Sequence, residues 1–170
     1  MSLRHAVLGL LAQQPGSGYD LLKRFEERFT FVWPATQSQL YGELGKMEKA
    51  GLVRVAAEGP RGRKEYEITP DGHADLRHWL IEVVPDGTKR DDRLLRVFFL
   101  SVLSPEEART YLQQNLEVFT ERLEALHEIE RVTEWGPGLG AKYGRISLEF
   151  GLRQLVMLRD WAEWSLKQFE

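Results

Sequence analysis

The sequence contains no cysteine, and this absence narrows the chemistry that its 170 residues can perform. It excludes disulfide bonds, thiol nucleophiles and zinc sites with cysteine ligands. Four histidines are present, but no two are spaced i, i+4, so the sequence predicts no metal site, and we expect no cofactor. The lack of cysteine also suits a reducing cytoplasm, where we expect the protein to act.

Long apolar runs are missing as well. No run approaches the roughly 20 residues that a membrane-spanning helix needs. The apolar segment Ala6–Ala12 is short, and Gln13 and Gln14 follow it where a signal peptide would have small residues. We therefore interpret this segment as part of a buried helix and expect no membrane partner.

The residue patterns of common active sites are not found. Ser17 lies between two glycines but lacks the strand–turn–helix context of a nucleophile elbow. The glycine-rich run Gly136–Gly140 follows a predicted helix instead of a strand, so it does not fit a phosphate-binding loop. The sequence therefore predicts that the protein is not an enzyme.

A large excess of positive charge is also absent, since the formal net charge is −3. Residues 1–80 hold 11 Lys+Arg and 10 Asp+Glu, whereas residues 81–170 hold 12 and 16. Bulk charge does not drive this chain to nucleic acid. Any nucleic-acid surface must be a local patch in the first half.

A helix with a marked start is predicted after Thr36. Thr36 and Gln39 have the spacing of a capping box. Apolar residues then recur at i, i+4 and i+7 and form one stripe: Leu40, Leu44 and Met47. The opposite face is small or polar and carries Gln37, Ser38, Tyr41, Gly42, Gly45 and Glu48. Gln and Ser side chains can bond to base edges, although an ordinary amphipathic helix with two weak glycine positions is the alternative.

A two-stranded ribbon is predicted next. The β-type runs Leu52–Ala56 and Lys64–Ile68 are joined by a loop that contains glycine and proline. Three positive charges, Arg61, Arg63 and Lys64, crowd into four residues at its tip. An α-helix fits the DNA major groove and a basic ribbon beside it can bind phosphate. A solvated loop is the alternative for the three charges.

The order of elements predicts a winged helix-turn-helix. A helix at 3–14, a second helix capped by Ser17 and an aromatic loop at 29–34 precede the capped helix and ribbon. A further helix begins at Thr69-Pro70 and extends through Val83. We expect this domain to occupy residues 1–84.

The second half is predicted to be helical and to form a dimer. After a linker at 85–89 we expect a short helix at 91–102, a long helix from Ser104 and a last helix at about 141–169. The long helix has a heptad-type seam: Leu112, Leu116, Phe119, Leu123 and Leu126. The last helix is apolar on more than one face, so a second chain is its natural cover. The expected fold is mainly α with a small β-wing, in which residues 90–170 form a long-helix, coiled-coil-type dimerisation domain.

Three runs of the first half resemble the PadR family of transcriptional regulators. They are S-G-Y-D-L-L-K at 17–23, F-V-W-P-A-T-Q-S-Q-L-Y-G-E-L-G-K-M-E-K-A-G-L-V at 31–53 and G-R-K-E-Y-E-I-T-P-D-G at 62–72. The resemblance spans about residues 3–83. The loop before R-K-E-Y is shorter than is common in the family, so the wing is expected to reach less far. The second half resembles the α-helical C-terminal domain of the family's virulence-activator branch.

The resemblance implies roles for individual residues. Tyr19 and Lys23 would contact phosphate, Gln39 and Tyr41 would belong to the recognition helix, and Lys64 would belong to the wing. The alternatives are a core ring for Tyr19, a solvated charge for Lys23 and a purely capping role for Gln39. Tyr66 is expected to be a core ring.

The family also includes sensors of phenolic acids and of flat aromatic drugs, so we consider a small aromatic effector. Five aromatic residues of the second half are candidates for its pocket: Phe98, Phe99, Phe150, Trp161 and Trp164. Aromatic rows at helical spacing are more often part of a core, which is the alternative.

Together these features predict a homodimeric, sequence-specific DNA-binding transcriptional regulator that acts on a palindromic operator, with a repressor favoured over an activator. A small aromatic effector would relieve the repression. The alternative is a helical, dimeric adaptor that holds protein through the winged domain and does not bind DNA.

Overall fold

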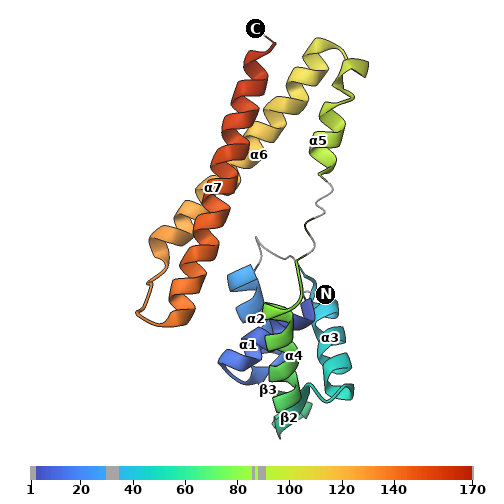
Figure 1. Ribbon diagram of the computed structural model, residues 1–170, viewed down its shortest axis with the longest axis vertical. Coiled ribbons are helices and arrows are strands. Elements are labelled where there is room, and N and C mark those ends of the chain that lie inside the picture. Colours follow the sequence, from blue (N-terminus) through green and yellow to red (C-terminus); the bar gives the residue numbers. More distant parts are fainter. Residues whose placement is uncertain (1–2, 30–34, 86, 88–90, 170) are drawn as a thin grey trace. The chain divides into compact units, whose positions relative to one another are not determined.

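The protein is described by a computed structural model that covers residues 3–29, 35–85, 87 and 91–169, apart from the side chains of Arg28 and Arg61. Most of the predicted aromatic loop, including Phe31 and Trp33, lies outside these residues. The chain divides into two compact units, Met1–Thr88 and Lys89–Glu170, and each is considered by itself (Figure 1).

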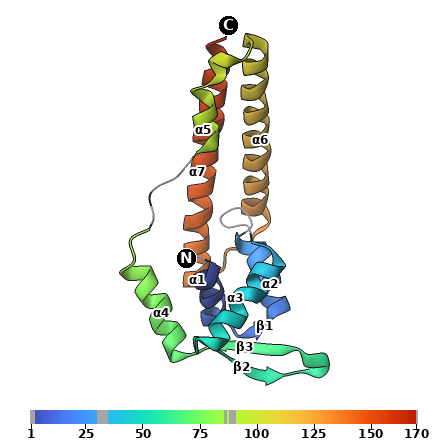
Figure 2. The ribbon, with the colours of Figure 1, turned by 90° about the vertical axis from the view of Figure 1, so that its right-hand side faces the viewer.

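The first unit has the elements of a winged helix-turn-helix, as predicted. In chain order they are α1 (Leu3–Gln13), β1 (Gly16–Ser17), α2 (Gly18–Phe29), α3 (Gln37–Lys49), β2 (Val53–Glu58), the 3₁₀ turn η1 (Pro60–Gly62), β3 (Lys64–Ile68) and α4 (Pro70–Ile81). The three strands form an antiparallel sheet in the order β1-β3-β2. The β2–β3 hairpin is the wing (Figure 2).

The third strand of this sheet was not expected from the sequence. Gly16 and Ser17 were interpreted as a helix end and a helix cap, but they also pair with Tyr66 and Glu65 of β3. A strand of two residues has no alternating pattern to recognise, because its pairing depends on a partner far along the chain. Ser17 nevertheless caps α2, since its Oγ accepts a hydrogen bond from the Asp20 N–H at 3.3 Å.

The predicted helix caps are present. At the start of α3 the Thr36 N–H donates to Gln39 Oε1 at 2.9 Å, and the Gln39 N–H donates to Thr36 Oγ1 at 3.3 Å. Thr69 caps α4 by accepting from the Gly72 N–H at 3.1 Å. Gly51, with φ 72°, follows the end of α3, where a left-handed conformation suits glycine. These local signals fix where α3 begins and ends and where α4 begins.

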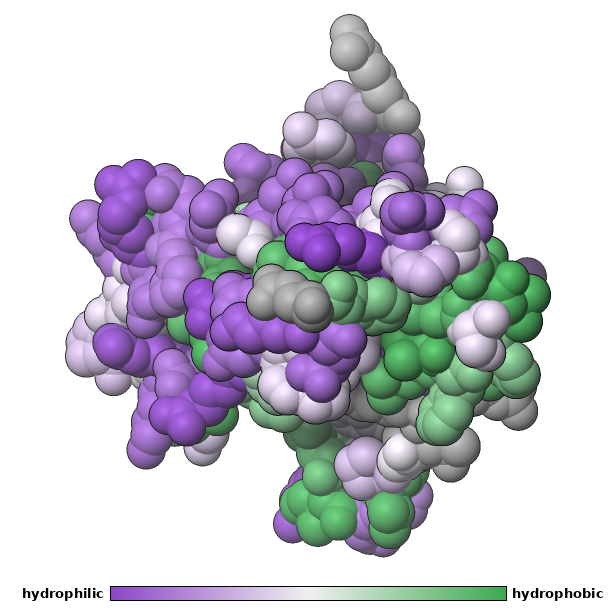
Figure 3. Space-filling view, turned by 90° about the horizontal axis from the view of Figure 1, so that it is seen from above, coloured by the Kyte–Doolittle hydropathy of each residue, from purple (hydrophilic) through white to green (hydrophobic). Residues whose placement is uncertain are grey.

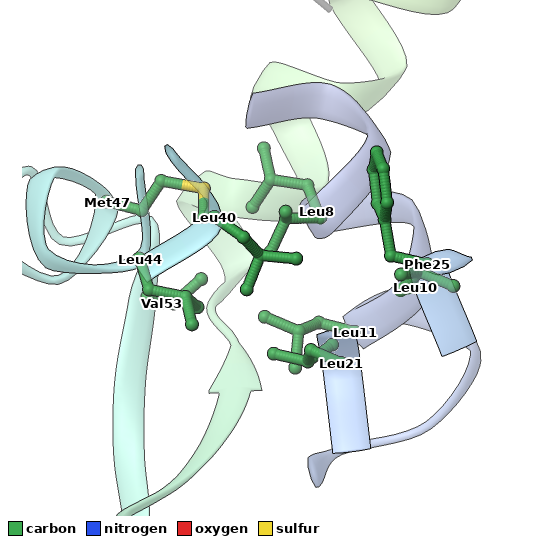
Figure 4. Packing of buried hydrophobic residues seen from close by; sticks show 10 residues of the cluster. Leu8, Leu10, Leu11, Leu21, Phe25, Leu40, Leu44, Met47 and Val53 are labelled. Atoms are coloured by element: carbon green, nitrogen blue, oxygen red, sulfur yellow. The ribbon is translucent and has the colours of Figure 1, made fainter. Parts of the chain in front are cut away.

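One apolar core holds the first unit together (Figure 4). It draws residues from α1, α2, α3 and β2, none more than 2% exposed: Val7, Leu8, Leu10, Leu11, Leu21, Phe25, Leu40, Leu44, Met47 and Val53. The stripe predicted for α3 therefore faces this core, and the other face of the helix points away from it. The helix expected to extend through Val83 ends earlier, because α4 stops at Ile81 and Val83 lies beyond its C-cap, Glu82.

The second unit consists of helices. They are α5 (Asp92–Val97), the 3₁₀ turn η2 (Leu100–Val102), α6 (Pro105–Val132) and α7 (Leu139–Lys167). The long helices α6 and α7 lie side by side in both ribbon views (Figures 1 and 2). A single helix over 91–102 was wrong, because Phe99 has φ −112° and ψ 7°, outside the helical region, and divides it into two turns. The long helix begins at Ser104 as predicted, and Ser104 forms a capping box with Glu107.

The α6–α7 pair buries few side chains completely. The seam of α6 is covered at Leu112, Phe119, Leu123 and Leu126, and a cluster of three residues joins the helices: Leu123, Leu126 and Leu152. Large apolar side chains of α7 remain more than half exposed: Leu139, Tyr143, Ile146, Phe150, Met157 and Trp164. The space-filling view shows apolar side chains (green) at the surface beside polar ones (Figure 3). Across the described residues, the helices are too short or too polar to span a membrane.

Candidate nucleic-acid interface

The outer face of α3 is open to solvent. Gln37, Ser38, Tyr41 and Gly42 are exposed, whereas the neighbouring stripe residues Leu40, Leu44 and Met47 are at most 1% exposed. A Cβ atom added at Gly42 or at Gly45 would meet nothing within 4 Å. A partner can therefore approach the backbone of this helix closely, as the two glycines suggested.

Tyr41 connects α3 to the start of α2. A Cβ atom at Gly18 would lie 2.5 Å from Tyr41 Cε1 and 3.1 Å from Tyr41 Oη, so the tyrosine ring occupies the space that a side chain at 18 would need. The next residue, Tyr19, is 68% exposed, so the alternative of a core ring is wrong for Tyr19. Because Gly18 has no side chain, the Tyr41 ring can lie beside the first turn of α2, which also carries Tyr19.

Arg63 of the wing reaches back to the same turn. Its Nη2 donates to Asp20 Oδ2 at 2.8 Å, and this oxygen also accepts from the Ser17 Oγ at 2.6 Å and the Ser17 N–H at 3.0 Å. The hydrogen bonds from Ser17 are the largest cause of a lowered Asp20 pKa, and Arg63 adds to it. Asp20 is therefore ionised at neutral pH and holds the guanidinium of Arg63, which lies between η1 and β3 at the tip of the wing.

Lys64 is held by α3 itself. Its Nζ lies 3.3 Å from Glu48 Oε1, in the last turn of α3, and this hydrogen bond is the first cause of a raised Lys64 pKa. Tyr66, two residues on, packs against the core as expected, and its burial raises the pKa of its phenol. The first cationic residue of β3 is thus tied to the end of α3.

The remaining predicted site residues differ in how free they are. The Gln39 Oε1 atom is occupied by the capping box, which leaves its amide N–H groups for other partners. Lys23 is exposed on α2. Arg61 lies on η1, and its side chain is outside the described part of the structure. The cap consumes the acceptor that bidentate pairing of Gln39 with adenine would need.

Three residues that organise this surface were not singled out from the sequence for that role: Gly18, Asp20 and Glu48. Asp20 had a local signal, because Ser17 and Asp20 have capping-box spacing. Its pairing with Arg63 had none, since the two residues are 43 positions apart. Glu48 was placed on the outer face of the helix, but its partner could not be identified without the fold.

The candidate effector residues are not enclosed within one chain. Phe98, Phe99, Phe150 and Trp164 are between 60% and 82% exposed, and Trp161 is half-buried. The described residues also contain no group of three or more His, Asp or Glu side chains that could hold a metal ion. The aromatic side chains are therefore available to a ligand or to another chain.

Both halves of the chain match family models. Residues 7–78 match the model described as "Transcriptional regulator PadR-like family", and residues 89–170 match "Virulence activator alpha C-term". Two curated relatives are the negative transcriptional regulator PadR of Bacillus subtilis, 35% identical, and the probable transcriptional regulator Rv1176c of Mycobacterium tuberculosis, 39% identical. These alignments span 68% and 48% of this chain, and 65% and 45% of the relatives, so the matched part is less than two thirds of each relative.

Solved structures match over nearly the whole chain. The crystal structure of Bacillus subtilis PadR in complex with operator DNA has 30% identity and a TM-score of 0.83, with both chains covered completely. The same protein in complex with p-coumaric acid has 28% identity and a TM-score of 0.85, with 99% of each chain covered. The Vibrio cholerae virulence activator AphA has 28% identity and a TM-score of 0.84, with 98% of this chain and 97% of that chain covered.

Proposed function

This chain belongs to the PadR-like family of transcriptional regulators, and on that premise we propose that it binds double-stranded operator DNA. The family consists of transcriptional regulators and not of enzymes. We place the protein in the cytoplasm, in contact with the chromosome. Residues 1–84 would be the DNA-binding domain, and residues 90–170 would be the dimerisation domain.

The observation that carries the proposal is the open outer face of α3. An α-helix fits the major groove, where base edges present distinct patterns of donors and acceptors. Gln37, Ser38 and Tyr41 are exposed on this face and Gly42 leaves its backbone accessible. We assign base contacts to these three side chains and to the amide of Gln39. Phosphate contacts are assigned to the residues around them, because such contacts fix orientation: Tyr19, Lys23, Arg61, Arg63 and Lys64.

A homodimer is supported by the spacing of the exposed side chains on α7. Leu139, Tyr143, Ile146 and Phe150 are separated by four, three and four residues, and Met157 and Trp164 follow at intervals of seven. This heptad spacing gives one continuous apolar stripe, on a face of α7 distinct from the one that packs on α6. A second copy of the chain would cover it. Two DNA-binding domains related by a two-fold axis would then recognise a palindrome with half-sites roughly 34–36 Å apart or a multiple of that distance.

Repression and its relief by a small aromatic compound are the finer parts of the proposal. The Bacillus subtilis relative is named a negative transcriptional regulator, and one of its crystal structures contains p-coumaric acid. The exposed rings of Phe98, Phe99, Phe150 and Trp164, with Trp161, would become enclosed when α7 is covered by a second chain. Quenching of tryptophan fluorescence by small phenolic acids would test this pocket.

The DNA-binding proposal is tested by selecting bound fragments from random duplex DNA and measuring their affinity at two salt concentrations. Lys64→Ala should weaken operator and random DNA by the same factor and reduce the salt slope by at most about 0.9, since it removes a phosphate contact. Tyr41→Ala should mainly weaken the operator, by roughly 5- to 100-fold, because a base contact carries sequence preference.

The alternative function, a helical adaptor for protein partners, gives a different result. An adaptor would select no common sequence and would form no salt-sensitive band that resists competitor DNA. An operator-to-random affinity ratio left unchanged by Tyr41→Ala would remove Tyr41 from the reading surface.

A further inference from the structure

We propose that Glu48 and Asp20 act as internal competitors for DNA phosphate, occupying the cations of the wing until DNA replaces them. This inference rests on the proposed DNA binding and adds two acidic residues to it. Both ion pairs link the wing to a helix of the first unit: Lys64 to the end of α3, and Arg63 to the start of α2. Lys64 and Arg63 are thus each paired with a carboxylate in the free protein.

The Lys64–Glu48 pair has the geometry of a replaceable contact. The Lys64 side chain is 42% exposed and that of Glu48 is 35% exposed, so solvent and phosphate reach both. Lysine has three N–H donors, and Glu48 accepts from one of them at 3.3 Å. Exposed ion pairs are weak, so breaking one costs little free energy. A phosphate oxygen can therefore take the place of the carboxylate oxygen on the same ammonium group.

The Arg63–Asp20 pair allows the same exchange without leaving a carboxylate unpaired. The Asp20 Oδ2 atom accepts from Arg63 and twice from Ser17. If Arg63 turns to a phosphate, both hydrogen bonds from Ser17 remain and Asp20 stays in place. The guanidinium, with five N–H donors in a fixed fork, suits bidentate binding of phosphate.

The exchange has a signature in salt dependence. A phosphate that binds Lys64 approaches the negative charge of Glu48, and the two repel each other. The carboxylate that is released gathers a cation from solution, which offsets part of the counterion release from DNA. Wild-type protein should therefore show a shallower salt slope than a protein with the same cations and no competing carboxylate.

The test compares Glu48→Gln with Glu65→Gln. Each substitution removes one negative charge from the first unit. Glu65 is the neighbour of Lys64 on β3 and has an exposed side chain. Dissociation constants for the selected operator and for a random duplex are measured over a range of KCl concentrations. Glu48→Gln should bind both DNAs about two- to fivefold more tightly, with a salt slope steeper by up to about 0.9. Glu65→Gln should change affinity less than twofold and leave the slope unchanged.

Double mutants test whether the tighter DNA binding of Glu48→Gln comes from losing the Lys64–Glu48 ion pair. On a Lys64→Ala background, Glu48→Gln should give no gain beyond that of Glu65→Gln. Asp20→Asn, which keeps an oxygen acceptor for Ser17, should give a similar gain that depends on Arg63, and it provides a second route if Glu48→Gln does not fold. Equal gains from Glu48→Gln and Glu65→Gln, a gain that persists without Lys64, or weaker binding would overturn the inference. Failure of the wild type to bind any DNA would instead overturn the proposed function.

Discussion

The two units of this chain differ in how completely they bury their apolar side chains. The first unit closes a core of ten residues that are at most 2% exposed. The cluster that joins α6 and α7 has three buried residues that are 5–7% exposed, while six large apolar residues of α7 face solvent. The first unit can therefore complete its fold within one chain, whereas the second presents a surface that calls for another chain.

The largest expected effect comes from charging the exposed stripe of α7. Ile146→Asp combined with Phe150→Asp should convert the dimer to a monomer, because two carboxylates cannot be buried in an apolar contact without partners. The operator affinity should fall by at least roughly 100-fold, since a single reading head loses the linked second half-site. Light scattering at low micromolar concentration and operator titration measure the two effects.

Ser147→Asp is the matched control for this change. It adds a carboxylate next to Ile146 in sequence, but its side chain points about 100° away around the helix. It should remain a dimer. If the Ile146→Asp, Phe150→Asp double mutant stayed dimeric, the exposed stripe of α7 would not be the surface that a second chain covers.

The next largest effect tests how tightly the core of the first unit is packed. Leu44 is 1% exposed, and Leu44→Ala should lower the free energy of unfolding of the first unit by about 2–5 kcal/mol, through lost burial and a residual cavity. Ser38→Ala, on the exposed face of the same helix, should change it by less than about 0.5 kcal/mol. Urea unfolding followed by circular dichroism compares the two. A Leu44 cost as small as that of Ser38 would mean that the core is not tightly packed.

The smallest effect concerns His5, a buried histidine of the first unit. The His5 side chain is 7% exposed, stacks on Trp79 at 4.6 Å and lies 3.2 Å from Asp75 Oδ2. Burial is the largest cause of a lowered His5 pKa; Asp75 opposes it and Arg4 adds to it. A histidine with a lowered pKa favours the folded state in its neutral form. Its contribution is complete above the unfolded value of 6.5 and is lost as the pH falls below it, until the folded pKa is reached.

Thermal unfolding between pH 7.5 and 5 tests this expectation. The wild type should lose more stability across that range than His5→Gln, which cannot titrate. His73→Gln, at an exposed position of α4, should follow the wild type. Identical pH profiles for the wild type and His5→Gln would show that the buried ring does not titrate differently on folding.

The sequence was informative wherever the structure depends on neighbours in the chain. The capping box at Thr36, the helix start at Ser104 and the apolar stripe of α3 are patterns of four to eight residues, and each was confirmed. The helix break at Phe99 was missed because helical spacing continues through it, and only the backbone angles reveal the turn. Local pattern therefore located α3 and its buried face.

The organisation of the candidate site depended on contacts that no local pattern encodes. Arg63 and Lys64 were predicted as charges of a basic wing tip, without partners in the chain, and they are paired with Asp20, 43 residues away, and Glu48, 16 residues away. The ring of Tyr41 rests in a space that exists only because residue 18 is glycine. Such pairings follow from the packing of α2, α3 and the wing, and the sequence supplied the residues without their partners.

The two-residue strand β1 has a consequence for how the wing meets its target. By pairing Gly16 and Ser17 with Tyr66 and Glu65, it fastens β3 to the segment that leads into α2. A hairpin with one strand fastened in this way cannot swing independently of the helix that follows β1. The angle between wing and reading helix is thus set before any encounter, and little ordering entropy remains to be lost at the moment of docking.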